Sequence, residues 1–209
     1  MEQKYMNYKS AETEIVIKKS RFLSFIKRTE SEEEAKAFIA EVKKEHKTAT
    51  HNCSAYIIGK SALIQKADDD GEPQGTAGVP ILEVLKKEEL YNAAVVVTRY
   101  FGGIKLGAGG LIRAYSKGAS SAVKEAGKVV EVPVVPLTVT LDYTFTSKFE
   151  HYLETAEAAI VSQNYTDKVS YVLHVKEKGV DAIVNTLKEI TSNSFDYEEG
   201  DIIIAEETV

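Results

Sequence analysis

The sequence predicts an α+β protein of two domains, a mixed N-terminal domain over residues 1–133 and a ferredoxin-like C-terminal domain over residues 134–209. Three observations predict this class. Pro133 and Pro136 stand three positions apart in a valine-rich run, which is typical of a short extended connection. The charge changes there, from 21 basic and 18 acidic residues up to Pro133 to 5 and 14 after it. The order of the predicted strands and helices also differs between the two parts.

The C-terminal domain follows the β-α-β-β-α-β order of the ferredoxin-like fold. Apolar residues alternate with polar ones over 137–143, the period of a half-buried strand. Strands are also predicted over 160–165 and 169–175, a helix over 180–190 and one last strand within 195–204. Between the first two strands, a capping box at Ser147 and Glu150 predicts the start of a helix. We expect its buried face to hold Phe149, Tyr152, Leu153, Ala156 and Ile160.

The N-terminal domain mixes both kinds of element. The runs 15–17 and 22–26 predict a hairpin, and the runs 53–59 and 93–98 predict strands. The last of these is apolar without interruption, so we expect it at the centre of a sheet. A helix is predicted over 109–126, and the capping box of Ser31 and Glu34 starts an earlier one. That earlier helix places Ala35, Phe38, Ile39 and Val42 on one face. This order predicts a sheet layered with helices.

Composition excludes several classes of protein. No apolar run approaches the roughly 18 residues that span a bilayer, and the polar N-terminus does not resemble a signal peptide. Cys53 is the only cysteine, which excludes an internal disulfide and favours a reducing compartment. We therefore expect a cytoplasmic protein without a membrane partner. The net charge of −6 argues against non-specific binding of nucleic acid by the whole chain, but the two parts differ enough in charge to be judged separately.

The acidic turn, residues 67–78, contains four carboxylates, three glycines and a proline. Glycine and proline interrupt regular structure, so this segment is predicted to be a loop. Carboxylates this close together suit a divalent cation, general acid–base work or the binding of an arginine. A solvated surface turn is the alternative. Candidates for catalysis are Asp69, Asp70 and Glu72.

The glycine segment, residues 99–110, joins the predicted central strand to the helix over 109–126. Backbone N–H groups beside a helix N-terminus favour anions, which predicts an anion site. Neither common nucleotide motif fits: Leu111 and Ile112 replace the Lys-Ser/Thr of a Walker loop, and Ile112 replaces the third glycine of the dinucleotide motif. Close packing of the loop on the sheet is the alternative. The candidate anion-binding residues of the segment are Arg99, Gly102, Gly103, Lys105, Gly107, Gly109 and Gly110.

The helix after the glycine segment has a basic side. On a helical wheel Arg113, Lys117 and Lys124 lie within about 40° of one another. The apolar residues lie opposite them and are Leu111, Ile112, Tyr115, Ala119, Ala122, Val123 and Ala126. Residues 99–128 hold six basic residues and one acidic residue. Charge of a single sign favours a polyanionic partner such as RNA, and the outward face of an ordinary amphipathic helix is the alternative.

His51 and Cys53 stand two apart at the start of a predicted strand, so their side chains share a side of it. They are candidates for a base and a nucleophile, or for metal ligands. A buried Cys53 that packs as a small hydrophobic residue is the alternative. Because no second cysteine is present, we expect no metal site, and no cofactor is indicated.

The segments 69–80 and 95–111 closely resemble the IMPACT / YigZ family, and residues 18–22 and 51–53 match it as well. The resemblance covers essentially the whole chain and is greatest to the bacterial branch. It implies an N-terminal domain with the fold of a ribosomal-protein second domain and a C-terminal domain similar to one of elongation factor G. It also implies a link to translation, because the eukaryotic relative regulates activation of a stress-responsive initiation-factor kinase. That relative has an additional N-terminal interaction domain, so its partner is not carried over.

Three functions are compatible with the sequence. The first is a non-enzymatic, translation-associated protein that binds RNA or the ribosome through the cations named above. The second is an enzyme for a phosphorylated or anionic small molecule, with the acidic turn and the glycine segment in one site. The third is a protein-interaction module in which the acidic domain masks the basic side of the helix. The oligomeric state stays open.

Overall fold

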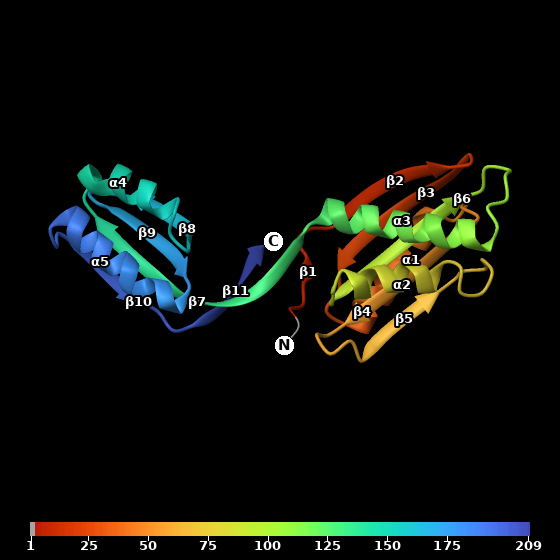
Figure 1. Cartoon of the computed structure of the whole chain (residues 1–209), viewed down its shortest axis with the longest axis horizontal. Coiled ribbons are helices and arrows are strands. Elements are labelled where there is room, and N and C mark those ends of the chain that lie inside the picture. Colours follow the sequence, from red (N-terminus) through yellow and green to blue (C-terminus); the bar gives the residue numbers. More distant parts are fainter. Residues whose placement is uncertain (1–2) are drawn as a thin grey trace. The chain divides into compact units, whose positions relative to one another are not determined.

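The computed structural model describes residues 3–209, and the chain divides into two compact units (Figure 1). Unit 1 runs to Val130 and includes Thr208–Val209, and unit 2 comprises Glu131–Glu207. The fold class is confirmed, since both units combine a sheet with helices. Within residues 3–209 no helix is both long and apolar enough to cross a membrane.

The sheet of unit 1 has five antiparallel strands in the order β2-β3-β6-β4-β5. The predicted hairpin is confirmed as β2 (Ala11–Ile17) and β3 (Ser20–Arg28). The strand β6 (Ala93–Tyr100) lies at the centre, as its uninterrupted apolar run predicted. It pairs with β3 on one side and with β4 (His51–Ile58) on the other, and β5 (Ile64–Asp68) forms an edge.

Helices cover both faces of this sheet. On one face α1 (Glu32–Glu45) buries Ala35, Phe38 and Val42 against alternate residues of β4 and β6. The Ser31 hydroxyl accepts the Glu34 N–H, as the capping box predicted, although the Glu34 carboxylate accepts the N–H of Glu30 rather than that of Ser31. On the other face α2 (Gly78–Lys87) and α3 (Ala108–Ala126) pack over the main core. The helix α2 was not predicted.

Unit 2 has the predicted β-α-β-β-α-β order. Its elements are β7 (Lys128–Leu141), α4 (Tyr143–Leu153), β8 (Ala158–Tyr165), β9 (Val169–Val175), α5 (Val180–Thr191), preceded by a 3₁₀ turn at Glu177–Gly179, and β10 (Phe195–Glu199). The antiparallel strand order β10-β7-β9-β8 is that of the ferredoxin-like fold. The short strand β1 (Met6–Asn7) and the final strand β11 (Ile203–Thr208) also pair with β7.

Three details of the predicted unit 2 are wrong. The helix α4 begins after Asp142, so Ser147 lies inside the helix and caps nothing. It ends at Leu153, so Ile160 belongs to β8 and is 43% exposed instead of lying on a buried helical face. The predicted last strand is two strands, β10 and β11, which residues 200–202 separate, although the Gly200 N–H still donates to the carbonyl of Pro136 in β7 at 2.8 Å.

Candidate functional site

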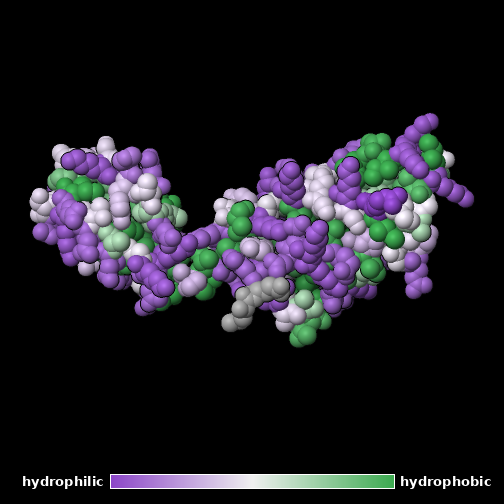
Figure 2. Space-filling model, viewed as in Figure 1, coloured by the Kyte–Doolittle hydropathy of each residue, from purple (hydrophilic) through white to green (hydrophobic). Residues whose placement is uncertain are grey.

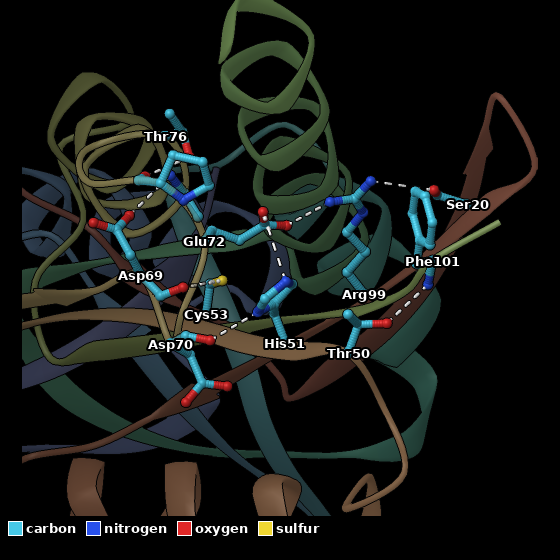
Figure 3. Close-up of polar contacts among 12 residues, drawn as sticks. Ser20, Thr50, His51, Cys53, Asp69, Asp70, Glu72, Thr76, Arg99 and Phe101 are labelled. Carbon is cyan, nitrogen blue, oxygen red and sulfur yellow. Dashed lines mark hydrogen bonds and ion pairs between the residues drawn. The ribbon is translucent and has the colours of Figure 1, made fainter. Parts of the chain in front are cut away.

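The acidic turn and the glycine segment meet in one pocket of unit 1, with a volume of about 450 Å³. Five of the candidate site residues line it: His51, Glu72, Arg99, Lys105 and Gly107. Figure 3 shows the polar side chains around it. The remaining lining residues are Thr50, Pro73, Phe101, Leu106, Ala108 and Leu111. The structure therefore brings together residues that lie up to 61 positions apart in the chain, Thr50 and Leu111, which sequence patterns alone do not join.

A buried ion pair forms the inner wall of the pocket. Arg99 Nη1 lies 2.7 Å from Glu72 Oε1, and the side chains of both are about 5% exposed. The Tyr115 hydroxyl donates to the same oxygen at 2.8 Å. Arg99 also lies over the rings of Phe22 and Phe101, 5.6 and 5.3 Å from their centroids. Its Nε is buried and has no hydrogen-bond partner among the described residues 3–209.

His51, the first residue of β4, has one ring nitrogen fixed and one directed at Glu72. Its Nδ1 lies 2.8 Å from the carbonyl oxygen of Asp70. A carbonyl oxygen only accepts, so this contact places a hydrogen on Nδ1. The other nitrogen, Nε2, lies 3.7 Å from Glu72 Oε2. His51 can therefore accept a proton at Nε2 from a group in the pocket, and a protonated His51 forms an ion pair with Glu72.

Asp69 and Asp70 do not line the pocket. The Asp69 carboxylate accepts the backbone N–H groups of Gly75, Ala77 and Gly78 at 2.8–3.0 Å. It thereby binds the first N–H groups of α2, whose N-cap residue provides no side chain for this purpose. A Cβ on Gly78 would overlap the backbone of Asp68, so the turn requires glycine there.

Asp70 holds the turn against its surroundings. Its carboxylate accepts Lys43 Nζ at 2.7 Å and the Asn52 N–H at 2.6 Å. Partial burial alone would lower the pKa of Lys43, but its hydrogen bonds to Asp70 and Asp68 raise that pKa above its ordinary value. No cluster of three His, Cys, Asp or Glu side chains in residues 3–209 is arranged to hold a metal ion.

Cys53 is fully buried beneath the turn. Its thiol donates to the carbonyl oxygen of Asp69 at 3.0 Å. Burial raises the pKa of this thiol far above its ordinary value, and the nearby carboxylates of Glu72, Asp70 and Asp69 raise it further. A thiolate is the reactive form of cysteine, so the geometry favours the packing role of Cys53 over that of a nucleophile.

The glycines of the segment serve different purposes. Gly102 lies so close to the β2–β3 turn that a Cβ would overlap the carbonyl of Lys19. Gly107 has φ of 72° and precedes α3 without a side-chain cap. The first N–H groups of α3 have no partner within the helix, and Gly107 and Ala108 line the pocket. Gly109 and Gly110 belong to the first turn of α3 itself, and Gly103 (φ 82°) lies in the loop.

Four cations of the segment and of α3 are exposed: Lys105, Arg113, Lys117 and Lys124. None of the four forms an ion pair within residues 3–209, whereas Arg99 and Lys128 are paired with Glu72 and Glu88. Figure 2 shows hydrophilic side chains along the path of α3 in the face that it draws. Ile112 was expected on the buried side of the helix but is 42% exposed.

Two further cations lie beside the glycine segment; the family resemblance covers them, but no sequence pattern gave them a role. Lys18 and Lys19 form the two-residue turn between β2 and β3, and both are exposed. Their φ values are 44° and 66°, a left-handed conformation that two-residue hairpin turns ordinarily fill with Asn or Gly. Ser20, the next residue, accepts the N–H of Gly102 and thereby joins this turn to the glycine segment. The sequence did contain one indication of this turn's importance, because a two-residue hairpin turn usually has Asn-Gly where this chain has two lysines.

Comparisons with known proteins agree with this architecture. The Impact N-terminal domain matches residues 18–123, and a domain of unknown function (DUF1949) matches residues 139–194. The chain is 47% identical over 206 residues to the Bacillus subtilis protein "IMPACT family member YvyE", covering 98% of this chain and 95% of that one. It is 37% identical to the Escherichia coli protein "IMPACT family member YigZ", covering 71% and 74%.

More distant similarity reaches eukaryotes. The Saccharomyces cerevisiae "Protein IMPACT homolog" is 38% identical over 93 residues, 42% of this chain and 35% of that protein. A crystal structure of a hypothetical protein has a TM-score of 0.60 at 31% identity and covers 94% of this chain and 97% of its own.

Proposed function

Because the chain belongs to the IMPACT family, we propose that it is a cytoplasmic, translation-associated regulatory protein that binds RNA, free or within the ribosome. The contact surface, called here the α3 basic surface, consists of Lys105, Arg113, Lys117 and Lys124. The observation that carries the proposal is that all four cations are exposed and unpaired within residues 3–209 and belong to a segment, residues 99–128, in which six basic residues accompany a single acidic one.

The charge pattern favours a polyanion over an ordinary solvated helix face. Solvated faces of helices usually mix signs, and ion pairs then form at i, i+3 or i, i+4 spacing, as Lys36 and Glu32 do in α1. The one acidic residue of α3, Glu125, pairs with a cation outside the helix, since its Oε1 lies 3.6 Å from Lys9 Nζ. From Arg113 to Lys124 the helix rises about 16 Å. Such a row of cations can neutralise several successive phosphates of a nucleic acid strand.

Charge reversal tests this proposal. In the variant Arg113→Glu/Lys117→Glu, we expect RNA affinity to fall by at least about tenfold at low salt, because attraction to two phosphates becomes repulsion. Gel shift with an unstructured RNA and co-sedimentation with ribosomes measure it. Lys44→Glu/Lys47→Glu is the matched control, since it makes the same charge change near the end of α1, on the opposite face of the sheet. If the wild type binds neither RNA nor ribosomes at low salt, the proposal is wrong.

The second candidate is an enzyme that acts on a phosphorylated or anionic small molecule. The observation that favours it is the juxtaposition of His51 Nε2, Glu72 and Arg99 at the wall of one pocket. A carboxylate far from Arg99 would have excluded such a site, whereas Glu72 contacts it directly. Turnover of phosphate esters by the wild type, lost in His51→Ala while RNA binding is kept, would favour this candidate over the first.

A further inference from the structure

We propose that the pocket at the start of α3 holds the phosphomonoester end of an RNA strand, whose following phosphates lie along the rest of the α3 basic surface. This inference rests on the proposed function and specifies the chemical group that the pocket selects. Three features carry it: the uncapped helix N-terminus, a buried guanidinium with a free donor, and a buried inner wall beside an exposed aromatic ring.

The helix N-terminus provides donors and a favourable dipole. The helix α3 is 19 residues long and its N-cap residue, Gly107, provides no side-chain acceptor. Its first N–H groups therefore have no partner within the helix and lie at the pocket, where Gly107 and Ala108 form part of the lining. The partial positive charge at this end favours a phosphate. Lys105, two residues earlier in the same lining, adds a full charge.

Arg99 is the second, independent indication of an anion. Its side chain is 6% exposed and lines the pocket, and its Nε donor has no partner among residues 3–209. Buried donors are almost always satisfied in proteins, by protein groups, water or ligand. An oxygen of a bound phosphate is an acceptor that satisfies a guanidinium N–H. Because Nε is itself shielded from solvent, such an oxygen reaches it only after Arg99 or a side chain that packs on it, such as Phe101, moves.

The nearby carboxylate does not oppose this ligand. The Glu72 side chain is 4% exposed, and its Oε1 already accepts from Arg99 at 2.7 Å and from Tyr115 at 2.8 Å. The charges of Glu72 and Arg99 therefore offset each other, which leaves Lys105 and the α3 N-terminus as the uncompensated positive charge. A phosphomonoester carries up to two negative charges, so it gains more here than an internal phosphodiester does.

The shape of the pocket favours a chain end. Glu72 and Arg99 form a buried inner wall, so a strand that enters meets side chains instead of a passage. On the outer side, Phe101 is 46% exposed and gives a ring on which a terminal base can stack. The α3 basic surface begins at Lys105 in the pocket and continues along the exposed side of α3. The phosphates bound beyond the pocket would all be internal diesters of the strand.

End-labelled oligonucleotides test the assignment in the full chain. Three RNAs of one unstructured 12-residue sequence are compared by fluorescence anisotropy: a 5′-phosphate, a 3′-phosphate and a hydroxyl at both ends. We expect one phosphorylated end to bind about tenfold more tightly than the hydroxyl RNA, as a charge-assisted hydrogen bond predicts. In Lys105→Ala this ratio should fall towards one. In the matched variant Lys117→Ala the affinities for all three RNAs should fall by the same factor, so the ratio of phosphorylated to hydroxyl RNA should stay at about tenfold.

Amide chemical shifts of ¹⁵N-labelled protein locate the end directly. Addition of the phosphorylated RNA should shift the amides of Gly107, Ala108 and Gly109, and the hydroxyl RNA should shift them less. Equal affinity for all three RNAs would overturn the assignment of the pocket and leave the proposed function standing. If uridine 5′-monophosphate shifts these amides while no oligonucleotide binds, the pocket belongs to a free nucleotide, and the RNA end and the proposed function are both wrong.

Discussion

Lys18 and Lys19 hold left-handed backbone conformations at the tip of the β2–β3 hairpin. Most residues with a Cβ adopt this conformation at a cost of about 1 kcal/mol or more. Gly, which has no Cβ, and Asn, whose side chain bonds locally, adopt it more readily. Both side chains are exposed, and neither forms an ion pair within the described part of the chain. Backbone strain of this kind clusters at functional sites, which motivates a test of these two side chains. The turn adjoins the glycine segment, so both lysines can add to the positive charge of the α3 basic surface that we propose for RNA.

Replacement of this turn should separate stability from binding. In Lys18→Asn/Lys19→Gly we expect the free energy of unfolding to rise by about 1 kcal/mol, because the new residues suit an I′ turn. RNA affinity should fall at the same time, because two cations are lost. Urea unfolding and fluorescence anisotropy measure the two effects. Lys44→Gln/Lys47→Gln removes the same charge at α1 and should change neither by much. A variant that gains stability and keeps full affinity would show that the lysines have no part in binding.

At the scale of elements, Lys43 ties α1 to the acidic turn. Its Nζ lies 2.7 Å from Asp70 Oδ1 and 3.2 Å from Asp68 Oδ2. Burial by itself would raise the pKa of Asp68, but the Asp70 N–H and the Lys43 ammonium lower it below its ordinary value. A carboxyl whose pKa is lower in the folded state adds stability above its unfolded pKa, near 3.9. That stability is lost as the pH falls through the lower, folded pKa.

The substitution Asp68→Asn should therefore lower the free energy of unfolding slightly at pH 7 and leave it unchanged in acid. We expect a loss of less than about 1 kcal/mol at pH 7, since both side chains are partly exposed and the pair is screened by solvent. Once the pH has fallen below the lowered, folded pKa of Asp68, the variant and the wild type should become equal in stability, because both then lack the charge. Urea unfolding at pH 7, 5 and 3 measures the difference in the free energy of unfolding. The variant Lys43→Met should reduce the same pH dependence, because it removes the cation that pairs with Asp68. A pH-independent gap between wild type and Asp68→Asn would contradict this account.

Elements with a strong internal pattern were predictable. The uninterrupted apolar run of β6 placed it at the sheet centre, and the strand predicted over 169–175 is β9, which buries Val169, Tyr171, Leu173 and Val175 on one face. Ser147 failed as a helix start because Asp142, with an extended backbone, is already the N-cap of α4 five residues earlier. The start of α2 was missed because its capping acceptor lies far away in the sequence. The N–H groups of Ala77 and Gly78 donate to the Asp69 carboxylate, which is eight and nine residues earlier. Local patterns do not contain such a long-range cap.

The candidate site was predictable in composition but not in role. Chemistry-bearing residue types identified both the acidic turn and the glycine segment, and both contribute to the pocket. The separate roles of Asp69, Asp70 and Glu72 depend on which way each carboxylate points, and only the fold decides that. Glu72 faces Arg99 and His51, whereas Asp69 and Asp70 bind backbone N–H groups and Lys43. Likewise Arg99 and Lys105 look alike in sequence, but one is buried in an ion pair and the other is exposed.

At the scale of the whole molecule, the charge of unit 2 should weaken RNA binding through its long-range field. The chain has a net charge of −6, and residues after Pro133 contribute 14 acidic and 5 basic side chains. At an ionic strength of about 0.01 M the Debye length is about 30 Å, comparable to a small domain, and at 0.15 M it is about 8 Å. We therefore expect unit 2 to repel RNA at low salt and the repulsion to fade at physiological salt.

Neutralisation of exposed carboxylates in unit 2 tests this repulsion. Glu198→Gln/Glu199→Gln/Asp201→Asn changes three exposed residues and brings the net charge from −6 to −3. We expect RNA affinity to rise by a few-fold at about 0.01 M salt, and the gain to disappear at about 0.15 M because the field is screened. Anisotropy titrations at the two salt concentrations measure it, and thermal unfolding checks that the variant keeps its fold. A gain that persists at 0.15 M would indicate instead that the acidic unit masks the α3 basic surface by direct contact, since short-range ion pairs are screened far less than a distant field.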